Sequence, residues 1–194
     1  MAPTEEWMEA WQPMIDAVGR DFGGQVLVGA DRVEPGTIRR FLEPLELWSP
    51  IHEDDEAARE AGYRGVVAPV SSLLSYQLPA MWASGDPGVF VDADRNAQPA
   101  RSPVRPLVPD LAPPTTGYFA TDIELELLGD LCVGDRLTRR GNVLLSCEPK
   151  RTAVGLGAFT TWESAYYTTD EALIARIRTG LYFYNPHTED DEHA

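Results

Sequence analysis

Cysteine, histidine and lysine are scarce in this chain, and each scarcity excludes a class of site. The 194 residues include two cysteines, Cys132 and Cys147, whose spacing fits neither a disulfide framework nor a zinc motif. We expect both thiols to be buried as small apolar side chains. Two of the three histidines, His187 and His193, lie beside or within an acidic tail, so His52 is the only one expected inside the folded body. We therefore expect no metal site.

Positive charge is also sparse. Lysine and arginine total 16 against 31 acidic residues, which gives a formal net charge of −15. Nucleic-acid binding depends on clustered cations that neutralise phosphates, so a nucleic-acid partner is excluded. Residues 188–194 carry part of the acidity and are expected to form a disordered, solvated tail. Because arginine grips phosphate through two parallel hydrogen bonds, a local cluster remains compatible with a phosphorylated ligand.

Long apolar runs are missing. No segment approaches the roughly 20 apolar residues that a membrane-spanning helix needs. Residues 1–9 carry acids and lack the basic region of a secretory signal. These features predict a cytoplasmic protein with no membrane partner.

The apolar residues that are present predict an α+β domain. Residues 1–22 repeat apolar positions at helical spacing and predict a helical extension, interrupted at Pro13. Residues 25–33 have strand character. Four further strands, separated by short turn-forming sequences, predict an antiparallel meander over residues 118–127, 136–147, 153–168 and 172–184. Residues 23–187 are therefore expected to form a single domain.

The most apolar helical pattern begins at Val70. Its apolar positions recur at helical spacing, at Val70, Leu73, Leu74, Leu78, Met81 and Trp82. Pro79 should kink this helix or end it early. One long helix packed on a curved antiparallel sheet is the hot-dog arrangement, although other α+β folds fit the same element order.

A proline-rich stretch, residues 96–116, separates this helix from the four strands and holds six prolines. A structureless segment of about 20 residues inside a domain is usually functional or disordered. Its interspersed apolar residues favour an ordered flap, and a long surface loop without a role is the alternative.

A resemblance to a known family rests on the segment around His52. Residues 41–58 resemble the signature of MaoC-like (R)-specific enoyl-CoA hydratases, an aromatic residue followed by Gly-Asp-x-Asn-Pro-Ile-His and then a small residue. The chain matches that signature at Phe41, Pro50, Ile51, His52 and Ala58. Residues 61–69 resemble the turn into the central helix of the FAS1-like, or MaoC N-terminal-like, branch, and residues 133–137 resemble the Gly-Asp turn before a later strand. The resemblance implies a hot-dog fold and a CoA- or carrier-bound acyl thioester as substrate, without a further cofactor.

In that family an aspartate and the histidine form a dyad that activates water. The aspartate position holds Leu47 here and the asparagine position holds Ser49. Because leucine neither accepts a proton nor holds a water, the dyad is broken. The resemblance leaves His52 as the candidate catalytic residue, with Ser49 as a possible water contact. Glu53 or a partner's carboxylate could assist His52, and Glu46, one residue out of register, could replace the missing acid.

The resemblance places the thioester carbonyl at the N-terminus of the central helix, whose amide groups stabilise an enolate-like transition state. Pro69 has no N–H group, so Val70, Ser71 and Ser72 are the candidate donors. Ser71 and Ser72 could equally be plain helix caps.

Candidate contacts for the phosphates of CoA or pantetheine are basic residues of the flap, of a hairpin and of the last strand. They are Arg101, Arg105, Lys150, Arg151, Arg176 and Arg178. Exposed arginines are common, so solvation is the simpler interpretation for each one alone.

Broken dyads occur in two-subunit relatives that this chain resembles. The dehydratases of long-chain acyl synthesis and the hydratases of steroid side-chain β-oxidation pair a catalytic hot-dog subunit with a degenerate one that shapes the acyl tunnel. The resemblance therefore implies a heteromer, a heterodimer or heterotetramer. The alternatives are a self-sufficient homodimeric hydratase that uses His52 and an acyl-thioester-binding or assembly protein without chemistry. A hot-dog thioesterase ranks lower, because nothing resembles its nucleophile or base.

Overall fold

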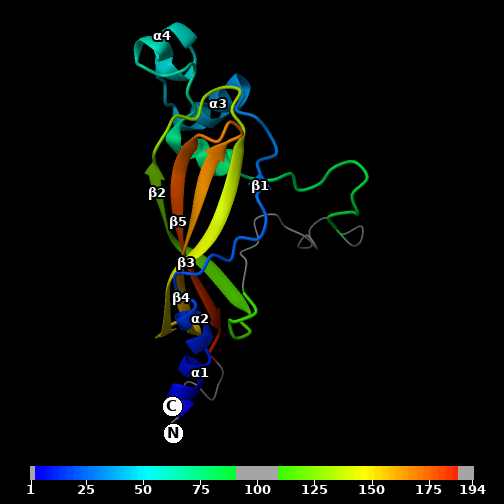
Figure 1. Cartoon of the computed structure of the whole chain (residues 1–194), viewed down its shortest axis with the longest axis vertical. Coiled ribbons are helices and arrows are strands. Elements are labelled where there is room, and N and C mark those ends of the chain that lie inside the picture. Colours follow the sequence, from blue (N-terminus) through cyan, green and yellow to red (C-terminus); the bar gives the residue numbers. More distant parts are fainter. Residues whose placement is uncertain (1–2, 91–108, 188–194) are drawn as a thin grey trace.

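A computed structural model describes residues 3–90 and 109–187. One five-stranded antiparallel sheet forms the centre, with helices at both of its ends (Figure 1). The strand order is β1-β3-β4-β5-β2, with bounds Leu27–Val28 (β1), Gly117–Leu127 (β2), Leu137–Thr152 (β3), Gly155–Thr168 (β4) and Leu173–Asn185 (β5). We call the end of the sheet beside α3 and α4 the upper end, and the end beside α1 and α2 the lower end.

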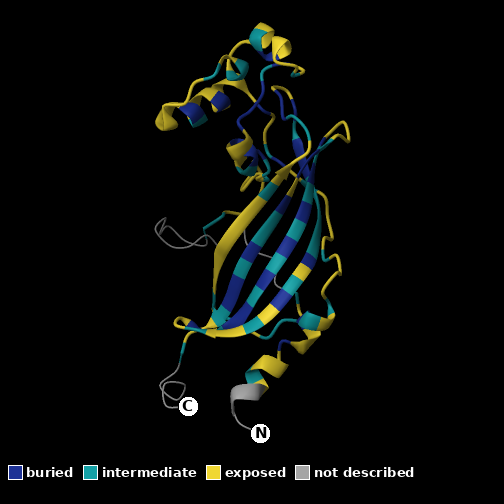
Figure 2. Cartoon of the chain, turned by 90° about the vertical axis from the view of Figure 1, so that its left-hand side faces the viewer, coloured by how far each residue is buried: buried dark blue, intermediate teal, exposed yellow. Residues whose placement is uncertain are grey.

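Strand β4 shows why one face of the sheet is buried. Every second residue from Ala158 to Thr168 is buried, whereas the residues between them are only partly so. Successive side chains of a strand point to opposite faces, so this alternation places one row of side chains against the core. Figure 2 shows the resulting bands of buried and less buried residues across the neighbouring strands.

The predicted meander is wrong in its order. Strands β3, β4 and β5 pair in sequence, but β2 pairs with β5 and not with β3, so it forms the opposite edge of the sheet from β1. Apolar alternation identifies a strand but does not name its neighbour. The predicted turn at residues 148–150 is also wrong, because β3 continues to Thr152. Pro149 is tolerated there because β1 pairs with β3 only near its upper end, which leaves the lower part of β3 as an edge.

The central helix is much shorter than the apolar pattern predicts. It consists of the 3₁₀ turn η3 (Val70–Ser72) and α5 (Leu73–Tyr76). Leu78, Met81 and Trp82 are exposed. The reason is Pro79, which disfavours helical geometry at the preceding residue and has no N–H to continue the ladder. The Leu78 carbonyl instead accepts a hydrogen bond from the Ala30 amide, 2.7 Å away.

The upper core joins this short helix to the sheet. It contains residues of the helix, of α3 (Pro35–Leu42) and of strands β3 to β5: Ile38, Leu42, Leu73, Tyr76, Leu137, Tyr166, Ile174, Ala175 and Ile177 are among them. After α3 come the 3₁₀ turns η1 (Glu43–Leu45) and η2 (Pro50–His52) and then α4 (Asp55–Glu60). The Asp54 side chain caps α4 by accepting the Ala57 amide.

The N-terminal segment supplies a second core at the lower end. It forms two short helices, α1 (Pro3–Glu9) and α2 (Gln12–Asp16). Trp11 and Met14 are buried against Leu144, Trp162 and other residues of β3 to β5. The strand predicted over residues 25–33 is reduced to β1, two residues long.

Two segments with predicted roles, the proline-rich flap and the acidic tail, lie partly or wholly outside the described residues. Residues 96–108 of the flap and the whole tail, residues 188–194, lie outside the described residues. No helix in the described part of the chain is long and apolar enough to cross a membrane.

Candidate functional site

A large groove separates the upper and lower cores. The central helix ends at Tyr76 and α2 ends at Asp16, so no helix of the described residues lies over the middle of the buried sheet face. The groove has a volume of about 670 Å³. Its walls are largely apolar and aromatic, with Leu27, Tyr118, Trp162, Tyr166, Ile177 and Leu181 among them. The early end of the central helix thus leaves room for a sizeable apolar ligand.

One lip of the groove is a close approach of two backbone segments. A Cβ atom on Gly23 would lie 2.7 Å from the Gly141 Cα, so this approach requires glycine. Asp21 joins the segments, because its carboxylate accepts the amides of Gly23 (2.7 Å) and Asn142 (2.8 Å). These two amide hydrogen bonds lower the pKa of Asp21.

A second cavity, of about 270 Å³, contains His52 at the upper end of the sheet. His52 ends η2, which Ser49 precedes and Pro50 begins. The Nδ1 atom of His52 lies 2.7 Å from the Val67 carbonyl oxygen. Because a carbonyl only accepts, Nδ1 carries a proton, and in the neutral imidazole Nε2 then has the free lone pair. The Val67 amide in turn donates to the Ile51 carbonyl, so two hydrogen bonds hold the histidine loop against the segment before the helix.

The N-terminus of the central helix lies at the same cavity. Pro69 and Val70 line it together with His52. The first amides of a helical segment have no acceptor within it, so the N–H groups of Val70 and Ser71 are available to a ligand. Ser72 is different: its amide (2.9 Å) and its hydroxyl (2.6 Å) both donate to the Pro69 carbonyl. Both of its donors are therefore already used.

No acid occupies the position of the family's aspartate. Leu47 is 59% exposed, and Glu46 is exposed in a left-handed turn with φ of 52°. Neither residue lines the cavity, so Glu46 does not replace the aspartate in this conformation. The carboxylate residue among the lining residues is Asp130. Sequence reasoning missed Asp130, because in Gly129-Asp130 it had only the character of a turn residue.

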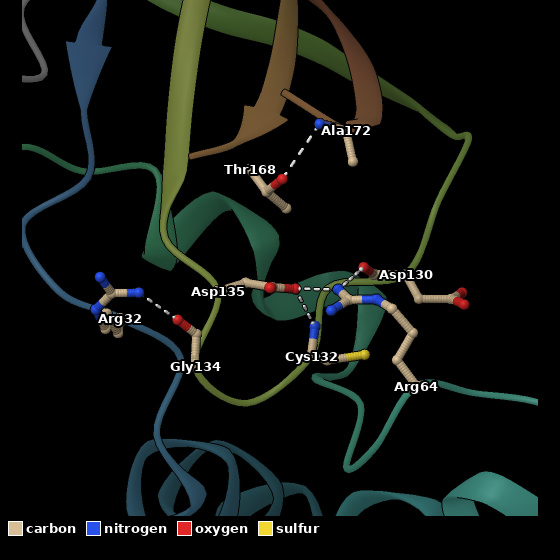
Figure 3. Close-up of polar contacts among 8 residues, drawn as sticks. All are labelled: Arg32, Arg64, Asp130, Cys132, Gly134, Asp135, Thr168 and Ala172. Atoms are coloured by element: carbon tan, nitrogen blue, oxygen red, sulfur yellow. Dashed lines mark hydrogen bonds and ion pairs between the residues drawn. The ribbon is translucent and has the colours of Figure 1, made fainter. Parts of the chain in front are cut away.

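A buried carboxylate, Asp135, holds the β2–β3 connection (Figure 3), which contributes Gly129, Asp130 and Leu131 to the lining of this cavity. Asp135 is 9% exposed and accepts the Cys132 amide (2.8 Å) and the Arg64 guanidinium (2.5 Å). Arg64 also donates to the Asp130 carbonyl. The Gly-Asp pair noted in the sequence therefore clamps the β2–β3 connection onto the segment that leads to Val67.

Replacing Asp135 by alanine is expected to destabilise the protein by about 2–3 kcal/mol, because it leaves the buried Cys132 amide without an acceptor. Urea unfolding of the two proteins measures this difference. The matched control is Asp55→Ala, which removes an exposed ion pair with Arg59 (side chains 59% and 62% exposed) and should cost less than about 1 kcal/mol. Equal losses in the two variants would show that Asp135 is no clamp.

The candidate phosphate contacts that the structure describes do not gather at this cavity. Arg101 and Arg105 lie outside the described residues. Arg178 is bound by Glu163 (2.9 Å) and Glu124 (3.2 Å), which raise its pKa, and Arg176 lies 3.6 Å from Glu126. Lys150 and Arg151 lie at the lower end of β3. Lys150 lies thirteen positions beyond Leu137 along this strand, roughly 40 Å, which is too far for it to share one ligand with His52 of the same chain. Within the described residues, no group of three or more histidine, cysteine or acidic side chains could hold a metal ion.

Comparisons with known proteins agree with this geometry. The family model described as "FAS1-like, dehydratase domain region" matches residues 16–177. A probable enoyl-CoA hydratase alpha subunit from Thermomonospora curvata is 30% identical over 183 residues. The alignment covers 94% of this chain and 52% of that relative, so the chain spans about half of the relative's length.

Two solved structures share the fold. In the ChsH1-ChsH2 complex from Mycobacterium tuberculosis, one chain is 21% identical with a TM-score of 0.62, covering 96% of this chain and 95% of that one. The MaoC-like dehydratase from Rhodospirillum rubrum is 20% identical with a TM-score of 0.54, covering 88% and 95%. The hot-dog fold predicted from the sequence is confirmed, with a shortened central helix.

Proposed function

We propose that this chain is a subunit of an enoyl-thioester hydratase or dehydratase of the cytoplasm. The proposal starts from its family: the chain belongs to the FAS1-like dehydratase region family of MaoC-like hot-dog proteins. The reaction adds water across the double bond of a trans-2-enoyl chain on CoA or a carrier protein. The observation that carries the proposal is the cavity shared by His52 and the N-terminus of the central helix.

The chemistry follows from the orientation of the imidazole. The His52 Nε2 lone pair takes a proton from water while the water oxygen bonds to C3 of the enoyl chain. Negative charge moves to the thioester oxygen, where the amides of Val70 and Ser71 can donate to it. A proton then bonds to C2, which completes the addition. His52 returns that proton directly, or a second acid supplies it and receives the proton of His52 in exchange.

A second MaoC-like subunit completes the site in this proposal. Leu47 replaces the acid of the dyad, and β2 is an open edge strand whose side chains Tyr118, Phe119, Ile123 and Leu127 are exposed. Such an edge invites pairing with another strand. Leu127 also lines the His52 cavity, so a subunit that pairs with β2 would reach it. The relative is named an alpha subunit, and the structural neighbour is one chain of a ChsH1-ChsH2 complex.

The groove supports a bulky acyl group. Its volume of about 670 Å³ exceeds the needs of a short chain such as crotonyl, and its apolar walls suit a long-chain or fused-ring (steroid) body. In this arrangement the chain forms much of the acyl site, and its partner contributes the acid missing from the dyad.

A second candidate function is a self-sufficient homodimeric hydratase. Asp130 favours it, because this carboxylate lines the same cavity as His52 and could supply the second proton. Loss of lone-chain activity in Asp130→Asn would identify this route. An acyl-thioester-binding protein without chemistry is the remaining alternative.

The test is an assay of the chain with a second MaoC-like subunit that has an intact aspartate and histidine, for instance one encoded by an adjacent gene. Crotonyl-CoA and a bulky enoyl-CoA are supplied, and the products are separated by mass. We expect a product heavier by one water with its thioester intact. Release of free CoA would indicate a thioesterase instead, and binding without turnover would leave only the binding role.

A further inference from the structure

One arginine of the groove has no acidic partner in the part of the chain that the structure describes. Arg139 lies on β3, is partly buried and lines the groove. None of the ion pairs among the described residues includes it, whereas Arg178 on the opposite face of the sheet is held by two glutamates. A guanidinium that is partly removed from water needs acceptors to offset its desolvation.

Tyr166, the cross-strand neighbour of Arg139, leaves guanidinium N–H groups of Arg139 available to a ligand. Arg139 pairs in register with Tyr166 of β4, which is 3% exposed and also lines the groove. The Tyr166 hydroxyl donates to Gln77 Oε1 at 2.6 Å, so its proton is used at the end of the central helix. Burial raises the pKa of Tyr166, and the adjacent Arg139 opposes that rise. The phenol can occupy one guanidinium N–H, and the other donors face no carboxylate among the described residues.

The other polar side chains of the groove, among the described residues, are uncharged: Gln25, Tyr118, Asn142, Ser164, Tyr166 and Thr179. The Ser164 hydroxyl donates to the Gly141 carbonyl at 2.9 Å. The apolar part of the wall includes Leu27, Trp162, Ile177 and Leu181. Arg139 is therefore the charged donor among the described residues of the groove, and charged groups form the strongest hydrogen bonds with an oxygen.

The sheet register sets the distance from this cation to the His52 cavity. Arg139 pairs with Tyr166, Tyr166 with Ala175, and Ala175 with Leu127, which lines that cavity. Three strand spacings separate the two ends of this row, roughly 14 Å between Cα atoms. An oxygen at Arg139 therefore belongs to the body of an acyl group and not to its thioester.

We propose that Arg139 binds a hydrogen-bond-accepting oxygen, a carboxylate or ring ketone, on a bulky apolar ligand held in the groove. The groove then selects oxygenated acyl groups over hydrocarbon ones of the same size. This substrate assignment rests on the proposed function, but the binding preference does not.

The test measures binding to the full chain without turnover. The probes are 1-acetylpyrene, 1-pyrenecarboxylate and 1-ethylpyrene, titrated by pyrene fluorescence; the ketone and the hydrocarbon have nearly the same shape. We expect the ketone, the carboxylate or both to bind about tenfold or more tightly than 1-ethylpyrene, as for a hydrogen bond to a charged group. The probe with the larger preference identifies the oxygen type.

In Arg139→Gln the preference should disappear while 1-ethylpyrene binding is retained. Arg139→Lys, which keeps the charge, should keep part of it and covers the case in which the glutamine variant folds poorly. The control Arg40→Gln removes an exposed cation of α3 and should change nothing. Equal preference in wild type and Arg139→Gln would overturn the proposal, as would a failure of the wild type to bind any probe. Absence of hydratase activity alongside Arg139-dependent binding would refute the proposed function and leave this inference standing.

Discussion

Replacing His52 by alanine is expected to lower kcat for enoyl-CoA hydration by the assembled enzyme about 10²-fold or more, with little change in KM. In the proposed mechanism the Nε2 lone pair of His52 is the proton acceptor, and losing a positioned base costs this much in acid–base catalysis. The measurement is the initial rate of crotonyl-CoA hydration by the two-subunit assembly with wild-type or variant chain.

His187→Ala is the matched control. The Nε2 atom of His187 lies 2.7 Å from the Thr152 carbonyl oxygen at the lower end of the sheet, remote from the His52 cavity. Its removal should leave kcat unchanged. If His52→Ala keeps the wild-type rate in a stable assembly, His52 has no part in the chemistry, and the chain contributes only the acyl site.

A bulky side chain in the groove is expected to lower kcat/KM for bulky substrates much more than for short ones. Ala120 on β2 is exposed and lines the groove, so tryptophan at this position extends into the space without displacing a buried side chain. We expect Ala120→Trp to lower kcat/KM for a fused-ring enoyl-CoA about 10²-fold, since bulk at the site strains the bound acyl group, and to leave crotonyl-CoA within about twofold. Competition assays with both substrates measure the ratio.

Ala153→Trp provides the same substitution elsewhere. Ala153 is exposed in the β3–β4 hairpin and does not line the groove. This variant should hydrate both substrates normally. Equal losses for short and bulky substrates in Ala120→Trp would contradict the assignment of the groove to the acyl chain.

Local patterns predicted the elements of this fold better than their arrangement. Apolar alternation identified all four long strands, because alternation follows from one buried face. It could not show that β2 pairs with β5, since the partner of a strand depends on the path of the whole chain. The pattern from Val70 to Trp82 predicted one helix, but the helix ends before Pro79, because proline cannot donate the backbone hydrogen bond that would continue it. The groove exists because the helix ends early, and no local pattern in the sequence predicts the groove.

The residues of the candidate site were likewise predicted only in part. The order of motifs predicted that residue 52 and the start of the central helix belong together, and both line one cavity. Asp130 and Arg139 were missed, because their positions depend on strand pairing and on the β2–β3 connection. The candidate cations Lys150 and Arg151 were chosen by residue type alone, and the length of β3 separates them from His52.

The central claim is that this chain holds the acyl group but lacks one acid of a complete hydratase. The most direct measurement is the hydration rate of a bulky enoyl-CoA as the second MaoC-like subunit is titrated into a fixed amount of the chain. The account predicts that the lone chain turns over about 10²-fold more slowly than the pair, and that the rate rises with added partner until the two are equimolar. A lone chain that matches the rate of the pair would contradict it.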